Sequence, residues 1–184
     1  VWRRKKTGLG QFIEVPLYDT GFFNTAPLSV QRMAGGPLAT RLGNGDHWAA
    51  PANRYVGSDG QALVAVADTD ARFEAMMETL ELAQTLHDVR FKDGFGRLKH
   101  RDELDEAVGG AIATKPASDW VDRLRTAGIP AALVRELPES IPSIETTRRD
   151  VTGMAPHPVI GEAPELAPAM RLKRRGLKPA QAAP

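Results

Sequence analysis

Hydrophobic residues between positions 53 and 67 follow the pattern of two short β-strands. Residues 61–67 are rich in apolar side chains, residues 53–56 end in the strand-forming pair Tyr55-Val56, and the turn-forming sequence Gly57–Gly60 separates the two runs. An Asp-Gly pair between two such runs is typical of a β-hairpin. The second run is apolar from Leu63 to Ala67 instead of alternating, which is the pattern of a strand covered on both faces. We therefore predict a hairpin whose second strand is buried.

Apolar side chains then recur at helical spacing in three segments downstream of the hairpin. Phe73, Met76, Met77 and Leu80 illustrate the pattern, since all four fall on one face of a helix. The helices are expected over residues 70–80, 102–113 and 116–127. A short apolar run at 131–134 predicts one further strand.

The two ends of the chain show weaker patterns. Alternation of apolar residues predicts a strand over 11–17, and a helix is expected over 20–33 with Asp19 as its N-cap. These pieces would have little core of their own. Near the other end, Val159-Ile160 is the clearest extended pair, and residues 173–184 are expected to be a frayed tail.

Composition narrows the classes of function. The 184 residues carry 24 basic and 23 acidic side chains, a net charge of +1, so we expect neither nucleic acid nor a membrane as partner. Cysteine is absent, which excludes disulfides and thiolate chemistry and fits a cytoplasmic protein. No apolar run approaches the ~20 residues that cross a bilayer. The four histidines form no HxH or HxxxH pair, so we expect no metal site.

Candidate chemistry is concentrated in the loop that precedes the hairpin. Gly43, Asn44 and Gly45 tolerate positive φ and expose backbone N–H groups, so this segment can approach a ligand closely. Asp46 and the titratable ring of His47 follow directly. We take these five residues as candidate substrate-binding residues.

Four stretches of the sequence carry a resemblance to a known family. They are Lys6–Gln11 followed by Val15–Asp19, Arg41–Asn44, Asp59–Phe73, and Arg101–Leu104 followed by Trp120-Val121 and Ala127–Ala131. In order and spacing they resemble the class III CoA-transferases of the CaiB/BaiF type. That family includes formyl-CoA transferase, carnitine CoA-transferase and α-methylacyl-CoA racemase.

The resemblance implies an α/β fold divided between two domains. Residues 1–36 would be the end of a Rossmann-like large CoA-binding domain and a linker. Residues 37–144 would be a small α+β domain with an antiparallel hairpin sheet and helices, and residues 145–184 a return segment toward the large domain and a tail. The family also implies an interlocked homodimer, a coenzyme A thioester as substrate and no permanently bound cofactor.

The implied activity is transfer of CoA between an acyl-CoA and a carboxylic acid through an aspartyl covalent intermediate. The family's nucleophilic aspartate would lie upstream of Val1, so we expect a fragment that is inactive alone. An acyl-CoA racemase or isomerase of the same family stays open as an alternative, as does a non-catalytic remnant or interaction module.

The resemblance also implies roles for two parts of the chain. A glycine-rich loop covers the reacting centre in formyl-CoA transferase, and Gly43–His47 matches it. In the racemase branch an acidic residue near the catalytic groups matches Asp70. The sequence favours a second role for Asp70, as the N-cap of the helix that begins there.

Overall fold

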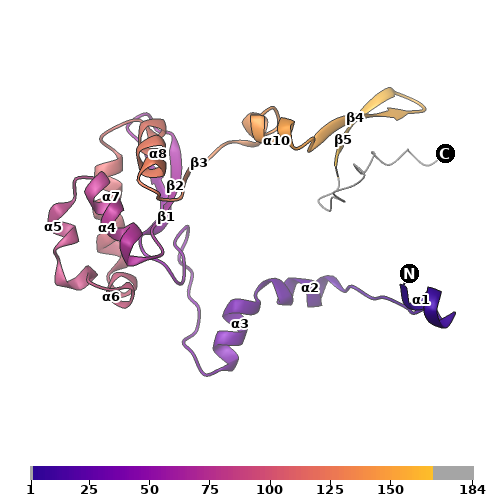
Figure 1. Cartoon of the computed structure of the whole chain (residues 1–184), viewed down its shortest axis with the longest axis horizontal. Coiled ribbons are helices and arrows are strands. Elements are labelled where there is room, and N and C mark those ends of the chain that lie inside the picture. The colour runs from indigo at the N-terminus through magenta and orange to yellow at the C-terminus, as the bar shows by residue number, and fades with distance from the viewer. Residues whose placement is uncertain (1, 168–184) are drawn as a thin grey trace. The chain divides into compact units, whose positions relative to one another are not determined.

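The chain combines helices with two small antiparallel sheets, as expected for part of an α/β protein (Figure 1). This computed structural model describes residues 2–167, apart from the side chains of Ile144 and Glu145, and the expected tail at 173–184 lies outside that range. The chain divides into two compact units, residues 1–47 and 48–184.

Residues 2–47 of the first unit form three helices and have no core of their own. The helices are α1 (Trp2–Thr7), α2 (Leu17–Asn24) and α3 (Ala26–Met33), and none of them buries a residue. The strand predicted over 11–17 is wrong, because residues 11–16 have no regular secondary structure. Strand residues need a partner for their backbone groups, and no described strand pairs with this segment.

The helix predicted over 20–33 is two helices, and the N-cap predicted at Asp19 is wrong. Helix α2 begins at Leu17 with Pro16 at its N-cap, so Asp19 lies in the first turn. The break falls at Thr25, just before α3, which carries Pro27 in its first turn. Proline has no N–H to donate and is tolerated only at the start of a helix, so it separates α2 from α3.

The second unit is organised around a three-stranded antiparallel sheet. Strands β1 (Ala52–Val56), β2 (Ala62–Val66) and β3 (Ala131–Leu133) lie in the order β1-β2-β3. The predicted hairpin is therefore confirmed, with Tyr55 opposite Leu63. The expected double coverage of β2 is wrong: Leu63 is fully buried, whereas Val64 on the other face is 40% exposed. Within the described residues of the second unit, helices cover only one face of this sheet.

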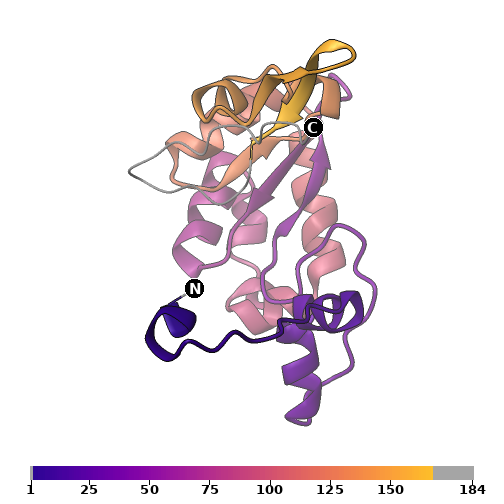
Figure 2. The ribbon, with the colours of Figure 1, turned by 90° about the vertical axis from the view of Figure 1, so that its right-hand side faces the viewer.

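Three longer helices supply that cover, and all three were predicted. They are α4 (Asp70–Thr79), α7 (Arg101–Ile112) and α8 (Ala117–Thr126). Figure 2 shows helices of this unit behind the long strands of the hairpin. Met76, Leu104 and Leu124 are fully buried between helices and sheet. Residues 83–99 add three short helical pieces: α5 (Ala83–Leu86), the 3₁₀ turn η1 (Val89–Phe91) and α6 (Gly94–Lys99).

A second hairpin follows two short helices, α9 (Leu137–Ser140) and α10 (Ile144–Arg148). Its strands are β4 (Thr152–His157) and β5 (Gly161–Leu166). The extended pair predicted at Val159-Ile160 is wrong, because these residues form the turn between the strands. Among residues 2–167, none of the helices combines the length and the apolar character that crossing a bilayer requires.

Candidate functional site

The predicted substrate-binding loop is built on a tight turn. The N–H of Gly45 donates to the carbonyl oxygen of Leu42 at 2.9 Å, which closes a β-turn around Gly43 and Asn44. Gly43 has a φ of +61°, and a side chain at this position would meet no atom within 4 Å. Glycine is therefore required by the backbone angle and not by crowding.

Exposure differs along this loop. Gly43 and Asn44 are exposed, whereas Gly45, Asp46 and His47 are half-buried. The turn thus presents its two central residues to solvent, as a segment that contacts a ligand requires. All five residues belong to the first compact unit.

Asp70, the second candidate, lies at the first residue of α4 and is not its N-cap. The side chain of Thr69 accepts the hydrogen bond from the N–H of Arg72, so Thr69 takes that position. The carboxylate of Asp70 instead accepts a 2.5 Å hydrogen bond from Nη2 of Arg97. The N-cap role predicted for Asp70 is therefore wrong, and its carboxylate is engaged in an ion pair.

Arg97 is a buried cation that the sequence reasoning missed. Its side chain is 4% exposed, while that of Asp70 is 70% exposed. Nη1 donates to the carbonyl oxygen of Phe91 at 3.2 Å, and the guanidinium carbon lies 4.6 Å from the centre of the Phe73 ring. Arg97 lies in a Gly-rich, polar stretch on α6, and no local pattern in that stretch indicates a buried arginine paired with a distant carboxylate.

A neighbouring ion pair is more exposed. Arg72 donates to the carboxylate of Asp68 at 2.6 Å, and this hydrogen bond lowers the pKa of Asp68 below its ordinary value. Both side chains are more than 40% exposed, so water screens their attraction. Of the two ion pairs beside the start of α4, the one between Asp70 and Arg97 is therefore less screened by water, because its arginine is buried.

A pocket outside these candidates was also missed. It lies between α8 and β3 and has a volume of about 390 Å³. The described residues contain no group of three or more histidine, cysteine, aspartate or glutamate side chains that would hold a metal ion.

The chain is similar over most of its length to known CoA-transferases. It is 24% identical over 151 residues to an acetyl-CoA:oxalate CoA-transferase of Acetobacter aceti, covering 82% of this chain and 39% of the relative. It is 21% identical over 182 residues to a succinyl-CoA:glutarate CoA-transferase of Mus musculus, covering 99% of this chain and 42% of the relative. The chain thus spans less than half the length of these curated relatives.

Solved structures show the same fold. A CaiB/BaiF family protein from Brucella suis matches with a TM-score of 0.75 at 22% identity, covering 96% of this chain and 45% of that one. A Mycobacterium tuberculosis protein matches with a TM-score of 0.79 at 17% identity, covering 95% and 45%. CoA-transferase family III matches residues 1–184, and the chain belongs to that family.

Proposed function

We propose that this chain is part of an enzyme that moves CoA between an acyl-CoA thioester and a carboxylic acid. The observation that carries the proposal is the match of CoA-transferase family III to residues 1–184. The relatives named for oxalate, glutarate and mesaconate as acceptors support it. Because all three acceptors are dicarboxylates, they are the first substrates to test.

The proposed chemistry uses an aspartate of the complete enzyme as nucleophile. Its carboxylate attacks the thioester carbonyl and expels CoA thiolate, which leaves a mixed anhydride. The thiolate then attacks the aspartyl carbonyl and releases the first carboxylate, so that CoA is held as an enzyme thioester. The acceptor carboxylate repeats the two steps in reverse. We place this aspartate outside the 184 residues, as the family resemblance implies, and assign the role to neither Asp19 nor Asp70.

Gly43–His47 would cover the reacting centre in this scheme. The exposure of Gly43 and Asn44 and the turn that presents them support this role. Backbone N–H groups in such a turn donate to the oxygen on which negative charge develops when the thioester is attacked. We further propose that the complete enzyme is an interlocked homodimer.

Hydroxylamine trapping tests the mechanism. The protein is expressed from its complete gene, incubated with succinyl-CoA or acetyl-CoA, and treated with hydroxylamine. Mass spectrometry should find one aspartate converted to a hydroxamate, outside residues 1–184. The 184-residue chain alone serves as the control and should remain unmodified. Absence of any trapped species in the complete protein would contradict the aspartyl route.

A racemase of the same family is the second candidate, and Asp70 favours it. Its side chain is 70% exposed and its carboxylate is held by a buried arginine, which is an arrangement suited to a carboxylate that contacts substrate. A racemase would exchange the α-hydrogen of an acyl-CoA with solvent deuterium without any acceptor acid. Deuterium incorporation therefore separates the two activities, and a protein that shows neither is the non-catalytic remnant.

A further inference from the structure

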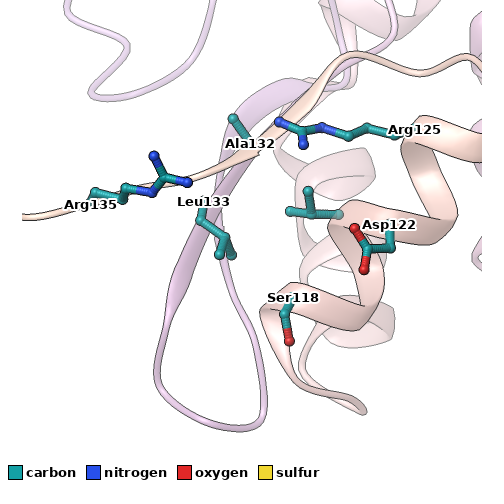
Figure 3. Close-up of a pocket in the computed structure, with 7 residues that line it drawn as sticks. Ser118, Asp122, Arg125, Ala132, Leu133 and Arg135 are labelled. Carbon is teal, nitrogen blue, oxygen red and sulfur yellow. The ribbon is translucent and has the colours of Figure 1, made fainter. Parts of the chain in front are cut away.

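The pocket between α8 and β3 brings two arginines to the open edge of the sheet. Ser118, Val121, Asp122 and Arg125 line it from successive turns of α8, and Ala132, Leu133 and Arg135 line it from the β3 side. Figure 3 shows the guanidinium groups of Arg125 and Arg135 reaching toward the same stretch of β3. Asp122 and Ser118 lie nearer the beginning of α8.

Backbone pairing shows which groups of β3 face the pocket. Val134 donates to the carbonyl oxygen of Ala62 at 2.8 Å, and Val66 donates to that of Pro130 at 3.0 Å. In an antiparallel ladder the residues between these bonded positions turn their N–H and C=O groups the other way. Ala131 and Leu133 therefore direct their backbone groups away from β2, at the edge that no other described strand pairs with.

Arg125 is held in place at this edge. Its Nε donates to the carbonyl oxygen of Ala131 at 2.7 Å, which is one of the outward-facing groups. This bond fixes the plane of the guanidinium along β3 and leaves its terminal nitrogens at the pocket. A planar guanidinium fixed in this way is suited to a carboxylate, whose two oxygens it can bind together.

The remaining lining residues define the rest of the ligand. The side chains of Val121 and Leu133 supply an apolar floor for a short carbon chain. At the other end, Asp122 would repel a second negative charge and accept a hydrogen bond from a hydroxyl or amino group. The volume of about 390 Å³ leaves room for a short-chain acid together with the water that hydrates its exposed side.

We propose that this pocket binds a small organic acid whose carboxylate contacts Arg125 and whose far end carries a hydroxyl or amino group near Asp122. None of the residues that line this pocket belongs to the loop at Gly43–His47, and the proposal does not depend on the transferase chemistry. Its selectivity follows from the order of charges along the pocket: the positive charge of Arg125 lies next to β3, and the negative charge of Asp122 lies nearer the beginning of α8.

NMR titration of the 184-residue chain tests this proposal. Amide signals are followed at constant ionic strength, in carboxylate-free and phosphate-free buffer, during addition of 4-aminobutyrate, 4-hydroxybutyrate, butyrate or succinate. Saturable shifts are expected at Leu133, Ala132 and Arg125. The first two acids should bind more tightly than butyrate, and succinate should bind most weakly because of Asp122. Succinate binding as tightly as 4-aminobutyrate, or no saturable shift at these amides, would overturn the proposal.

Three variants locate the site. Arg125→Gln should raise the Kd about tenfold or more, because a hydrogen bond to a charged group is lost. Arg123→Gln is the matched control: Arg123 lies on the same helix beside the Trp120 ring and outside the pocket, so its loss should leave the Kd unchanged. Ala132→Leu fills the pocket at an exposed residue without changing any charge and should also weaken binding. Equal effects of the two arginine variants, or unchanged binding in Ala132→Leu, would overturn the assignment.

Discussion

Tyr55 and Asp105 join the first strand of the sheet to helix α7 through a 2.6 Å hydrogen bond from the phenol to Oδ1 of the carboxylate. The second oxygen, Oδ2, accepts a hydrogen bond from Nδ2 of Asn53 at 2.8 Å. Tyr55 is 5% exposed, so its hydroxyl has little access to water. Asp105 thus satisfies two polar groups of one strand from the helix packed against it.

Replacing Asp105 should therefore destabilise the second unit. Asp105→Ala leaves a buried hydroxyl and a half-buried amide without their acceptor, which is expected to lower the free energy of unfolding by about 1–3 kcal/mol. Urea denaturation followed by circular dichroism measures the loss. Glu106→Ala, at the next and exposed position of α7, is the control and should change little. Equal effects of both variants would contradict the role of Asp105.

The same pair predicts a loss of stability at alkaline pH. Burial, together with the hydrogen bond to Asp105, raises the pKa of Tyr55 above its ordinary value. The folded chain therefore keeps a proton that the unfolded chain releases above about pH 10. Since the folded state then binds more protons, this contribution to stability is present below about pH 10 and decreases as the pH rises further.

Tyr55→Phe should remove this contribution, so its urea midpoint should fall less steeply than that of the wild type between about pH 9 and pH 11. Tyr18→Phe changes the other tyrosine, which is 81% exposed. Its urea midpoint should decrease with pH as steeply as that of the wild type. Identical slopes in Tyr55→Phe and the wild type would show that Tyr55 does not control the alkaline transition.

Much of the second unit is predictable from the sequence because local pattern and tertiary packing agree there. The hairpin around Gly57–Gly60 and the helices α4, α7 and α8 combine a clear period with a turn or end signal. Residues 11–16 lack that agreement: their alternation is typical of a strand, yet no described strand pairs with them. Ile13 is 73% exposed and Val15 is 74% exposed, so the alternation buries nothing.

Prolines in both strands made the second hairpin difficult to predict from the sequence. Pro156 and Pro164 argue against strands, because proline cannot donate to a ladder. The N–H of Ala167 donates to Val151, which places Gly153 and Ala155 in the bonded positions and turns the alternate residues outward. Both prolines stand at outward positions of a two-stranded ladder, where no donor is needed. The sequence alone does not reveal the register of the two strands, and without the register the outward positions of the prolines cannot be predicted.

The candidate site was predictable only in part. The glycines of the loop signal a turn, and the structure contains one at Gly43-Asn44. The partner of Asp70 was not predictable, because Arg97 lies 27 residues away in the sequence and its side chain reaches Asp70 from another helix, α6. Sequence patterns describe which residues share a face, but they do not show which faces meet.

Loss of Asp70 should reveal the cost of an unpaired buried cation. Asp70→Ala leaves Arg97 without its carboxylate and should lower the free energy of unfolding by about 1.5–3 kcal/mol. Combining it with Arg97→Met should recover part of that loss, because the buried charge is then also gone. Asp68→Ala breaks the exposed pair with Arg72 and should have a much smaller effect. Urea denaturation of Asp70→Ala, Arg97→Met, their double variant and Asp68→Ala measures this coupling, and strict additivity of the first two would contradict it.

The turn at Gly43 should be sensitive to any side chain. Gly43→Ala forces a Cβ onto a backbone with a φ of +61°, at a cost of about 1–2 kcal/mol. If the loop covers the reacting centre, this strain should lower kcat/KM of the complete transferase by about 5- to 30-fold. Asn44→Ala, at the adjacent exposed position, adds no such strain and separates backbone conformation from side-chain contact. Unchanged kcat/KM in Gly43→Ala would remove the loop from the proposed mechanism.

Two further glycines should respond to alanine with opposite signs. Gly57 lies so close to α8 that an added Cβ would stand 2.5 Å from the backbone nitrogen of Ala117. That nitrogen also donates to Asp59, so the contact holds the hairpin turn against the start of α8. Gly57→Ala should therefore push the turn and helix apart and lower the melting temperature.

Gly110 is the matched position for the opposite result. It lies inside α7, is exposed, and an added Cβ would meet no atom within 4 Å. Gly110→Ala should raise the free energy of unfolding by about 0.5–1 kcal/mol, because alanine loses less backbone entropy than glycine when a helix forms. Calorimetry measures the melting temperatures of Gly57→Ala and Gly110→Ala and so checks both predictions. A higher melting temperature of Gly57→Ala would show that the turn is not in contact with α8, because the lower backbone entropy of the unfolded variant would then outweigh any steric clash with Ala117.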